Sequence, residues 1–253
     1  MLIDVHSHLD DKSFDTDLKR VLENARRENI RVVTSCVNPD FFEKSLRIVK
    51  NNGVFLTLGL TPTILNPETL QLTTGLIEKN KNEIVGIGEV GLDYYWIKDN
   101  KKREKQKENF VRFIELSKKL DLPLVVHSRD AEHDVIKILK ENEKPALLHC
   151  FSGSLEQAND AISFGCLLSI PTSVVNSKQK QELVKKIPLD HIVLETDSPW
   201  LSPKPKTRNE PANLKFAAKK IAELTETDFQ TVSKRTTSNA ADFFNLNSKD
   251  LSQ

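Results

Sequence analysis

The 253-residue sequence has no apolar run long enough to cross a bilayer, which excludes a protein built from membrane-spanning helices. Residues 1–11 carry acids and histidines where an export signal would need a basic start and a continuous apolar segment. We therefore expect a cytoplasmic protein with no membrane partner.

The sequence also lacks an excess of charge, because 37 Lys and Arg residues balance 36 Asp and Glu residues to a net charge of +1. The balanced net charge therefore predicts no general electrostatic attraction to nucleic acid. A local basic run at residues 101–107 is typical of a solvated helix face. The 38% of hydrophobic residues are enough for a sizeable core.

Cysteine is scarce, and its three positions do not suit a disulfide framework. Cys36, Cys150 and Cys166 are odd in number, widely spaced, and each lies inside an apolar segment. This pattern favours buried, reduced thiols in a cytosolic protein. It gives no support to a zinc knuckle.

Eight short apolar runs recur along the chain, and each is followed by a polar stretch with helical periodicity. Near-continuous Val, Ile and Leu is typical of parallel strands that are buried on both faces. Eight such units predict a (β/α)8 TIM barrel of the α/β class, as a single domain over residues 1–253. An open, doubly wound sheet is the alternative, because periodicity does not reveal closure. The runs read LIDVH, RVVTSCV, FLTLGL, IVGIGEV, PLVVH, ALLHCF, CLLSI and HIVLETD.

The intervening segments predict the helices of the barrel. Asp40, Pro67 and Ser154 resemble N-terminal caps or first-turn residues. A proline-rich loop, SPWLSPKPKTRNEP, follows the eighth strand, and residues 225–245 predict an additional helix. No linker or internal repeat divides the chain. The predicted helices cover residues 16–29, 40–52, 67–80, 103–120, 131–142, 155–164, 178–186 and 212–224.

Four of the six histidines lie at the carboxyl ends of predicted strands, where barrel enzymes place their chemistry. His6 and His8 are two residues apart on an extended segment, so both side chains leave the same face and can bind one ion. The other two of the four are His127 and His149. His133 and His191 do not lie at strand ends, and we expect them to be outside the site.

Glu89, His127, His149 and Asp197 each end a different predicted strand, at matching depth. Taken singly, they have ordinary interpretations as core histidines, a salt-bridge partner and a helix cap. Taken together, several unpaired polar groups in one barrel mouth cost several kcal/mol each in desolvation unless something satisfies them. A divalent cation does so.

The segment from Gly86 to Gly91 matches G-x-G-x-x-G, the fingerprint of dinucleotide binding. That fingerprint requires a helix to begin inside it, whereas LDYYW follows here. These glycines are better explained by close backbone approach and a sharp exit from the strand, which present Glu89, Asp93 and Tyr94 at the rim.

The motifs VHSHLD, GEVGLDYY, VVHSRDA, LLHCFSG, ETDSPWL and RNEP together resemble the TatD family of metal-dependent deoxyribonucleases, which are amidohydrolase-like barrels. The resemblance runs in order from Ile3 to Pro211 and covers nearly the whole chain. It implies one or two divalent ions, with Mg, Mn and Zn all left open by the ligand types. In the implied arrangement one ion is held by His6, His8, Glu89 and Asp197, and a second by His127 and His149 with Glu89 bridging.

The chemistry of such a site is hydrolysis of a phosphodiester by an activated water. Asp197 is the candidate to orient or deprotonate that water, and Glu89 is the second candidate catalytic residue. Arg129, Arg208 and Asn209 lie in matched motifs where a guanidinium or amide can contact a phosphate. Tyr94, with the two aromatic residues after it, is a candidate to stack on bases.

One segment departs from the family pattern. Where the family commonly has Gly-x-His-Pro-His, this chain reads Gly-Leu-Thr-Pro-Thr, so Thr61 and Thr63 replace both histidines. A neutral hydroxyl gives less stabilisation of transition-state charge than a histidine at the scissile phosphate. This change places the reaction rate and the substrate class in doubt, and leaves metal binding untouched.

The sequence therefore predicts a deoxyribonuclease, including one that digests from a strand end, with DNA as its partner. One alternative is the same barrel acting on a small-molecule amide, lactone or phosphoester. Another is a metal-stabilised binding protein without catalysis. No protein partner is readable from the sequence.

Overall fold

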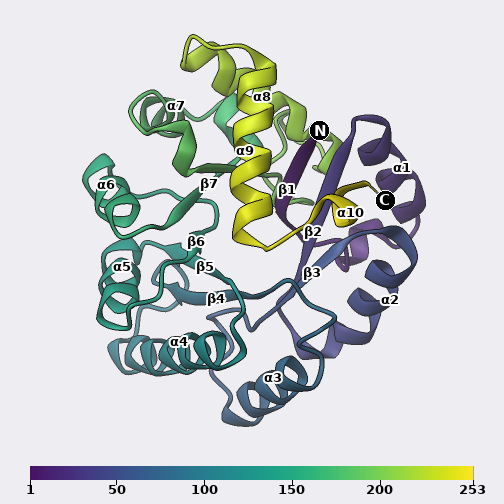
Figure 1. Cartoon of the computed structure of the whole chain (residues 1–253). Helices are drawn as coiled ribbons and strands as arrows, with labels where there is room; N and C mark the ends of the chain where they lie inside the picture. The colour runs from purple at the N-terminus through teal and green to yellow at the C-terminus, as the bar shows by residue number, and fades with distance from the viewer. Residues whose placement is uncertain (253) are drawn as a thin grey trace.

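The computed structural model describes residues 1–252, and its centre is a closed barrel of eight parallel strands in the order β1 to β8. Figure 1 shows the strands around one centre, with the helices that connect them on the outside. The prediction of a (β/α)8 barrel is confirmed. The open sheet is excluded because β1 pairs with β8 through Asp4 and Leu194. The strands are β1 (Leu2–Ser7), β2 (Ile30–Cys36), β3 (Phe55–Leu58), β4 (Gly86–Asp93), β5 (Leu124–Arg129), β6 (Leu147–Leu148), β7 (Leu167–Pro171) and β8 (Ile192–Glu195).

The predicted helices are present, with differences at their ends that local hydrogen bonds explain. The fourth helix begins at Asn100 because the Asp99 carboxylate caps it by accepting from the Lys102 amide. Ser154 forms a reciprocal capping box with Gln157, as expected of a cap. The α-helices are α1 (Leu18–Arg27), α2 (Phe42–Asn52), α3 (Pro67–Lys79), α4 (Asn100–Leu120), α5 (Glu132–Glu141), α6 (Leu155–Ser163), α7 (Lys178–Val184), α8 (Leu214–Leu224), α9 (Phe229–Phe243) and α10 (Ser248–Ser252). Short 3-10 turns are η1 (Lys12–Phe14), η2 (Pro39–Phe41), η3 (Thr172–Val175), η4 (Leu189–His191) and η5 (Pro211–Asn213).

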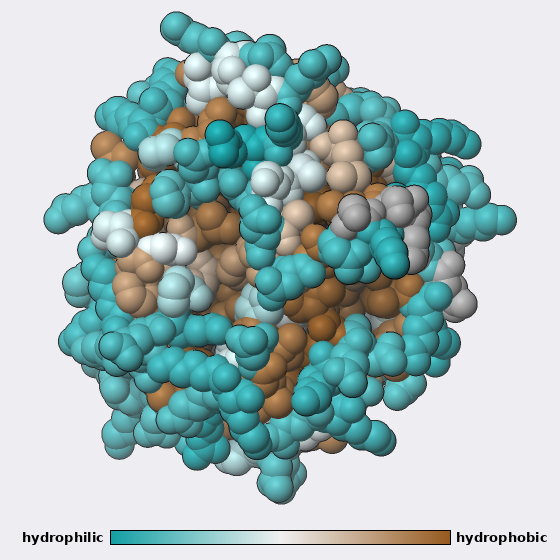
Figure 2. All heavy atoms as spheres, viewed as in Figure 1, coloured by the Kyte–Doolittle hydropathy of each residue, from teal (hydrophilic) through white to brown (hydrophobic). Residues whose placement is uncertain are grey.

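A small apolar cluster fills the amino-terminal half of the barrel interior. Side chains from five different strands belong to it, which is possible only inside the barrel. Ala240 and Phe244 of the α9 segment complete the cluster, so α9 closes this end (Figure 1). Figure 2 shows the same face, with apolar atoms toward the centre and hydrophilic side chains around them. The strand members are Ile3, Val5, Val33, Val125, Leu147 and Val193.

A polar layer follows toward the carboxyl ends of the strands. Side chains alternate along a strand, so a residue two places beyond an inward-facing one also faces inward. By this rule Ser35 lies beyond Val33, and Glu195 lies beyond Val193. Both are fully buried, and so is Thr57, which pairs with Ser35 across β2 and β3. The carboxyl half of the barrel is therefore lined by polar groups.

The three cysteines are free, and burial raises the pKa of each thiol. Cys36 and Cys166 are buried as expected, whereas Cys150 is half-buried. None of the helices that the structure describes is both long and apolar enough to span a membrane.

Gly88 in β4 has no space for a side chain, and we expect Gly88→Ala to destabilise the barrel. An added Cβ would lie 2.6 Å from the Val125 Cβ and 2.8 Å from the Val125 carbonyl oxygen. Overpacking of this kind costs about 1–3 kcal/mol, measured as free energy of unfolding in urea. Gly75→Ala is the matched control, because it lies in α3 with open space around it and should gain about 0.5–1 kcal/mol. Equal stability of the two variants would contradict the assignment of close strand contact at Gly88.

Candidate metal centre

Six side chains of metal-ligating type converge at the carboxyl end of the barrel. They come from β1 and the residue after it, from β4 and β5, and from the turns after β6 and β8. In three overlapping groups the ligand atoms lie within 4.8 Å of one another. The six are His6, His8, Glu89, His127, His149 and Asp197, the set predicted from the sequence.

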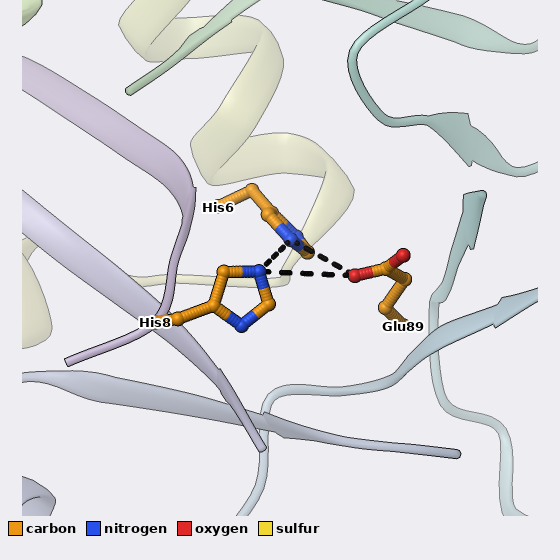
Figure 3. Close-up of side chains that lie close together, drawn as sticks. All are labelled: His6, His8 and Glu89. Carbon is orange, nitrogen blue, oxygen red and sulfur yellow. Dashed lines mark hydrogen bonds and ion pairs between the residues drawn. The ribbon is translucent and has the colours of Figure 1, made fainter. Parts of the chain in front are cut away.

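One half of the cluster surrounds a point between His6, His8 and Glu89, which face one another in Figure 3. The two Nε2 atoms of His6 and His8 are 3.1 Å apart, and His6 Nε2 is 3.3 Å from Glu89 Oε2. Asp197 Oδ1 lies 3.4 Å from His8 Nε2. Two ligands about 2.1 Å from one ion, at angles of 90° to 109°, are themselves about 3.0–3.4 Å apart. The donor set therefore fits a divalent cation.

The other half lies on the opposite oxygen of the same carboxylate. His127 Nδ1 is 2.8 Å from Glu89 Oε1, and His149 Nε2 is 3.7 Å from it. The two histidine nitrogens are 3.3 Å apart. Glu89 thus faces one pair of histidines with each oxygen, which is the arrangement that a bridging ligand requires.

Local structure near β1 and β8 holds the first half in place. The pairing of β1 with β2 shifts register between Asp4 and Ser7, just where His6 turns into the site. Buried Asp4 accepts hydrogen bonds from the amide and hydroxyl of Thr196, at 2.8 and 2.6 Å. The Asp197 amide donates to the His6 carbonyl at 3.0 Å, with Asp197 in the left-handed region at φ 52°. The ends of β1 and β8 are therefore fixed to each other beside the cluster.

Two carboxylates support the histidines from behind, and the sequence reasoning did not assign them this role. Asp93 Oδ2 lies 2.9 Å from His127 Nε2, and Glu195 Oε1 lies 3.3 Å from His149 Nδ1. Carboxylates on the far nitrogen of a ligating histidine fix its orientation and raise its basicity. The only signal in the sequence was their place in the GLDYY and ETD motifs, beside residues that were assigned.

Opposite charges set the protonation of the metal-free cluster. Burial disfavours the Glu89 carboxylate, but His149 and His127 outweigh it and hold its pKa well below the usual range. Burial also lowers the pKa of His127, yet Glu89 and Asp93 raise it to about 10. His8 behaves likewise, since Asp197 overcomes burial and raises its pKa to about 9. In His6 burial prevails and the pKa is lowered.

The cluster forms the floor of an open pocket of about 580 Å³. Of the predicted substrate contacts, Arg129 lines this pocket, with its guanidinium 3.7 Å from the centre of the Tyr95 ring. Trp96 and Trp200 line it as well, and so do Thr61 and Thr63. Residues from several loops thus surround the opening of the pocket above the cluster.

The structure does not bring three of the predicted substrate contacts to the cluster or to the lining of this pocket. The Tyr94 hydroxyl donates to Asp134 at 2.7 Å. The Arg208 guanidinium makes two bonds to the Asp17 carboxylate, at 2.9 and 2.7 Å. Buried Asn209 donates to Thr172 and to the Thr196 carbonyl. The proline-rich loop carries Arg208 and Asn209 past the pocket, whereas Tyr94 follows β4 and its hydroxyl is bonded to α5.

His133 and His191 lie outside the cluster, as expected. His133 is exposed on α5, and His191 lies in the η4 turn before β8.

The histidine pKa values predict how the stability of the metal-free protein depends on pH. The folded-state pKa of His127 (about 10) and of His8 (about 9) exceed the value of about 6.5 in an unfolded chain. The contribution of these two histidines to the free energy of unfolding is complete below about pH 6.5, and it is lost as the pH rises through 9 and 10. Urea unfolding of chelator-treated protein should therefore give a smaller free energy at pH 10 than at pH 6. A value that stays constant or rises would contradict these charge pairs.

We expect Asp93→Ala to weaken metal binding by about 10- to 100-fold, because His127 loses the carboxylate that orients it. Titration of stripped protein with zinc or manganese against a competing chelator measures this. Asp134→Ala is the control, since Asp134 accepts from Tyr94 away from the cluster and its loss should leave affinity unchanged. Equal affinity of the Asp93 variant and the unaltered protein would refute the supporting role.

Comparisons with known proteins agree with this geometry. A profile of the family described as TatD related DNase matches residues 3–245. The uncharacterised metal-dependent hydrolase YabD of Bacillus subtilis is 37% identical, over 98% of this chain and 100% of its own length. The human deoxyribonuclease TATDN3 is 38% identical, over 96% of this chain and 94% of its own. The crystal structure of the Escherichia coli TatD homologue YJJV superposes with a TM-score of 0.90 at 24% identity, covering 97% and 98% of the two chains, and supports the fold. The chain therefore belongs to the TatD family of metal-dependent hydrolases.

Proposed function

We propose that this protein is a divalent-metal-dependent deoxyribonuclease that cleaves phosphodiester bonds with an activated water. The observation that carries the proposal is the Glu89 carboxylate between two pairs of histidines, with Asp197 beside it, on the floor of an open pocket. Divalent ions held by these side chains would supply Lewis-acid activation of the water and of the phosphoryl oxygen. The human relative named a deoxyribonuclease supports DNA as the substrate.

Asp197 is the proposed proton acceptor. Burial disfavours its charged form, but the hydrogen bond to His8 and the nearby charge of His149 lower its pKa, so the carboxylate is ionised at neutral pH. Its side chain lines the pocket and reaches the substrate space directly. A carboxylate in this position can orient a water and take its proton as the water attacks phosphorus.

Arg129 is the proposed phosphate contact. Its guanidinium is exposed at the pocket edge, and stacking on Tyr95 fixes its plane. A planar guanidinium can donate two parallel hydrogen bonds to one phosphate, which positions the scissile group and offsets its charge.

Exposed aromatic side chains around the mouth favour a single-stranded or frayed substrate. Trp96 is 65% exposed and Trp200 52% exposed, although large apolar side chains are usually covered. Bases of an unpaired strand can stack on such rings whatever their sequence. This replaces the predicted contact of Tyr94, whose hydroxyl is bonded to Asp134.

A small-molecule ester or amide is the second candidate substrate. Thr61 and Thr63 line the pocket with hydroxyls 3.3 Å apart, in the segment where the family pattern has histidines. These hydroxyls are uncharged and offer less stabilisation to a phosphorane-like transition state than imidazolium groups. The pocket of about 580 Å³ also lies within the range for small ligands.

The test is digestion of end-labelled single- and double-stranded DNA by stripped protein, with magnesium, manganese or zinc added back. We expect cutting that requires the metal and falls by about 10²- to 10⁴-fold in Asp197→Asn. His133→Ala is the matched control and should cut normally, because His133 is exposed on α5.

Absence of DNA cutting with all three metals, together with metal-dependent hydrolysis of a nitrophenyl phosphoester, would replace the nuclease with the small-molecule enzyme. Salt-sensitive DNA binding without any turnover would instead indicate a binding protein. Equal loss of activity in the Asp197 and His133 variants would refute the site itself.

A further inference from the structure

A second pocket of about 300 Å³ adjoins the metal centre. It shares His127, Arg129, His149 and Asp197 with the first pocket, so a ligand at the metals extends into it. Its remaining lining comes from the turn after β6, from Lys180 of α7, and from Ser128, Glu132 and Leu201. Nothing in the proposed chemistry uses Lys180.

Lys180 is a buried cation that meets only neutral acceptors among the residues that the structure describes. The residue is 7% exposed, and its Nζ donates to the Phe151 carbonyl at 2.9 Å, the Ser152 hydroxyl at 3.1 Å and the Cys150 carbonyl at 3.3 Å. These acceptors fix the ammonium in position, but they are neutral. Within residues 1–252 no carboxylate forms an ion pair with it. A buried charge without an opposite charge is costly, and an anionic ligand in the pocket would remove that cost.

Arg129 provides a second unpaired cation at the junction of the two pockets. Its guanidinium stacks on Tyr95, and in the described part of the chain it makes neither a hydrogen bond nor an ion pair. The donors of its fork are therefore available to a ligand. Two cations, one at the junction and one on the far wall, thus face a pocket that is continuous with the reaction centre.

The acids of this wall do not cancel the two cations. Asp197 belongs to the metal cluster and faces His8 at 3.4 Å. Glu132 is the other acid of the lining, and within residues 1–252 it forms no ion pair with Lys180 or with Arg129. Neither cation is therefore neutralised by direct contact with an acid of this wall.

We propose that the second pocket is a phosphate subsite, in which Lys180 holds the phosphate next to the scissile one on a DNA strand, with Arg129 between the two. This rests on the proposed nuclease function and deepens it. A pocket of about 300 Å³ has room for a small ligand and not for a duplex, so the strand enters it single. The subsite fixes the register of the strand relative to the metals.

The test combines a change in the protein with a change in the substrate. Oligonucleotides carry one neutral methylphosphonate, moved one linkage at a time on either side of the scissile bond. Lys180→Gln should reduce kcat/KM on the all-phosphate strand by about ten-fold or more, the usual worth of a hydrogen bond to a charged group. On the strand whose adjacent phosphate is neutral, the variant and the unaltered enzyme should be equal.

Lys178→Gln is the matched control, because Lys178 is exposed on the same helix and should behave as the unaltered enzyme. Lys180→Arg, which keeps the charge, should retain discrimination against the neutral linkage. Where Lys180→Gln does not fold, the scan on unaltered enzyme decides, since a flat response outside the scissile position overturns the subsite.

A binding measurement separates this inference from the nuclease proposal. With chelator present, a fluorescein-labelled single strand should bind Lys180→Gln with a salt slope smaller by about 0.7 than for the unaltered protein, as expected for one lost phosphate contact. DNA cutting that is indifferent to Lys180 overturns the subsite alone. A lost contact in binding, with no cutting under any metal, overturns the nuclease and keeps the subsite.

Discussion

The Glu89 carboxylate between two pairs of histidines is the contact on which the site depends. Its two oxygens face nitrogens on opposite sides at 2.8 to 3.8 Å, so neither half of the cluster is independent of the other. The arrangement brings the lone pairs of the histidine nitrogens and the carboxylate charge together in a buried site, where water cannot form hydrogen bonds to them. Such a cluster is stable only when protons or cations lie between its members. Metal binding and the protonation of His8 and His127 are therefore alternative ways to meet one electrostatic requirement.

The barrel beneath the cluster is built to match this requirement. Its lower layer is apolar and closed by α9, whereas the layer under the ligands is polar. Asp93 and Glu195 reach the far nitrogens of His127 and His149, and Asp4 ties the ends of β1 and β8 together. Along a strand, the side chains that face the barrel interior change from apolar to polar between one inward-facing position and the next. Ligand orientation is thus fixed by rigid strands, and loops supply the surroundings.

Above the cluster lie exposed aromatic rings, and two cations that form no ion pair within residues 1–252. Trp96 and Trp200 are exposed at the mouth. Among the described residues, the Arg129 guanidinium stacks on Tyr95 without donating a hydrogen bond, and buried Lys180 meets only neutral acceptors. Side chains in such states are costly in isolation, and a strand with stacked bases and regular phosphates complements all of them. A different loop, which follows β3 and also lines the pocket, carries Thr61 and Thr63 in the segment where the family pattern has histidines. Loop differences of this kind change substrates in barrels while the metal site is kept.

Sequence alone indicated the number and order of the strands and the six side chains of metal-ligating type that the structure brings together. Buried parallel strands are continuous apolar runs, and a candidate ligand such as His127 or Asp197 directly follows such a run. Both features can therefore be recognised in the sequence. Closure was decided by tertiary structure, because it depends on β1 meeting β8. So were the supporting roles of Asp93 and Glu195, which depend on which nitrogen of a histidine faces which strand. The pairing of Arg208 with Asp17, and the neutral acceptors that Lys180 meets among the described residues, were not predictable for the same reason. The path of a long loop and the packing of a helix decide which groups a flexible cation contacts.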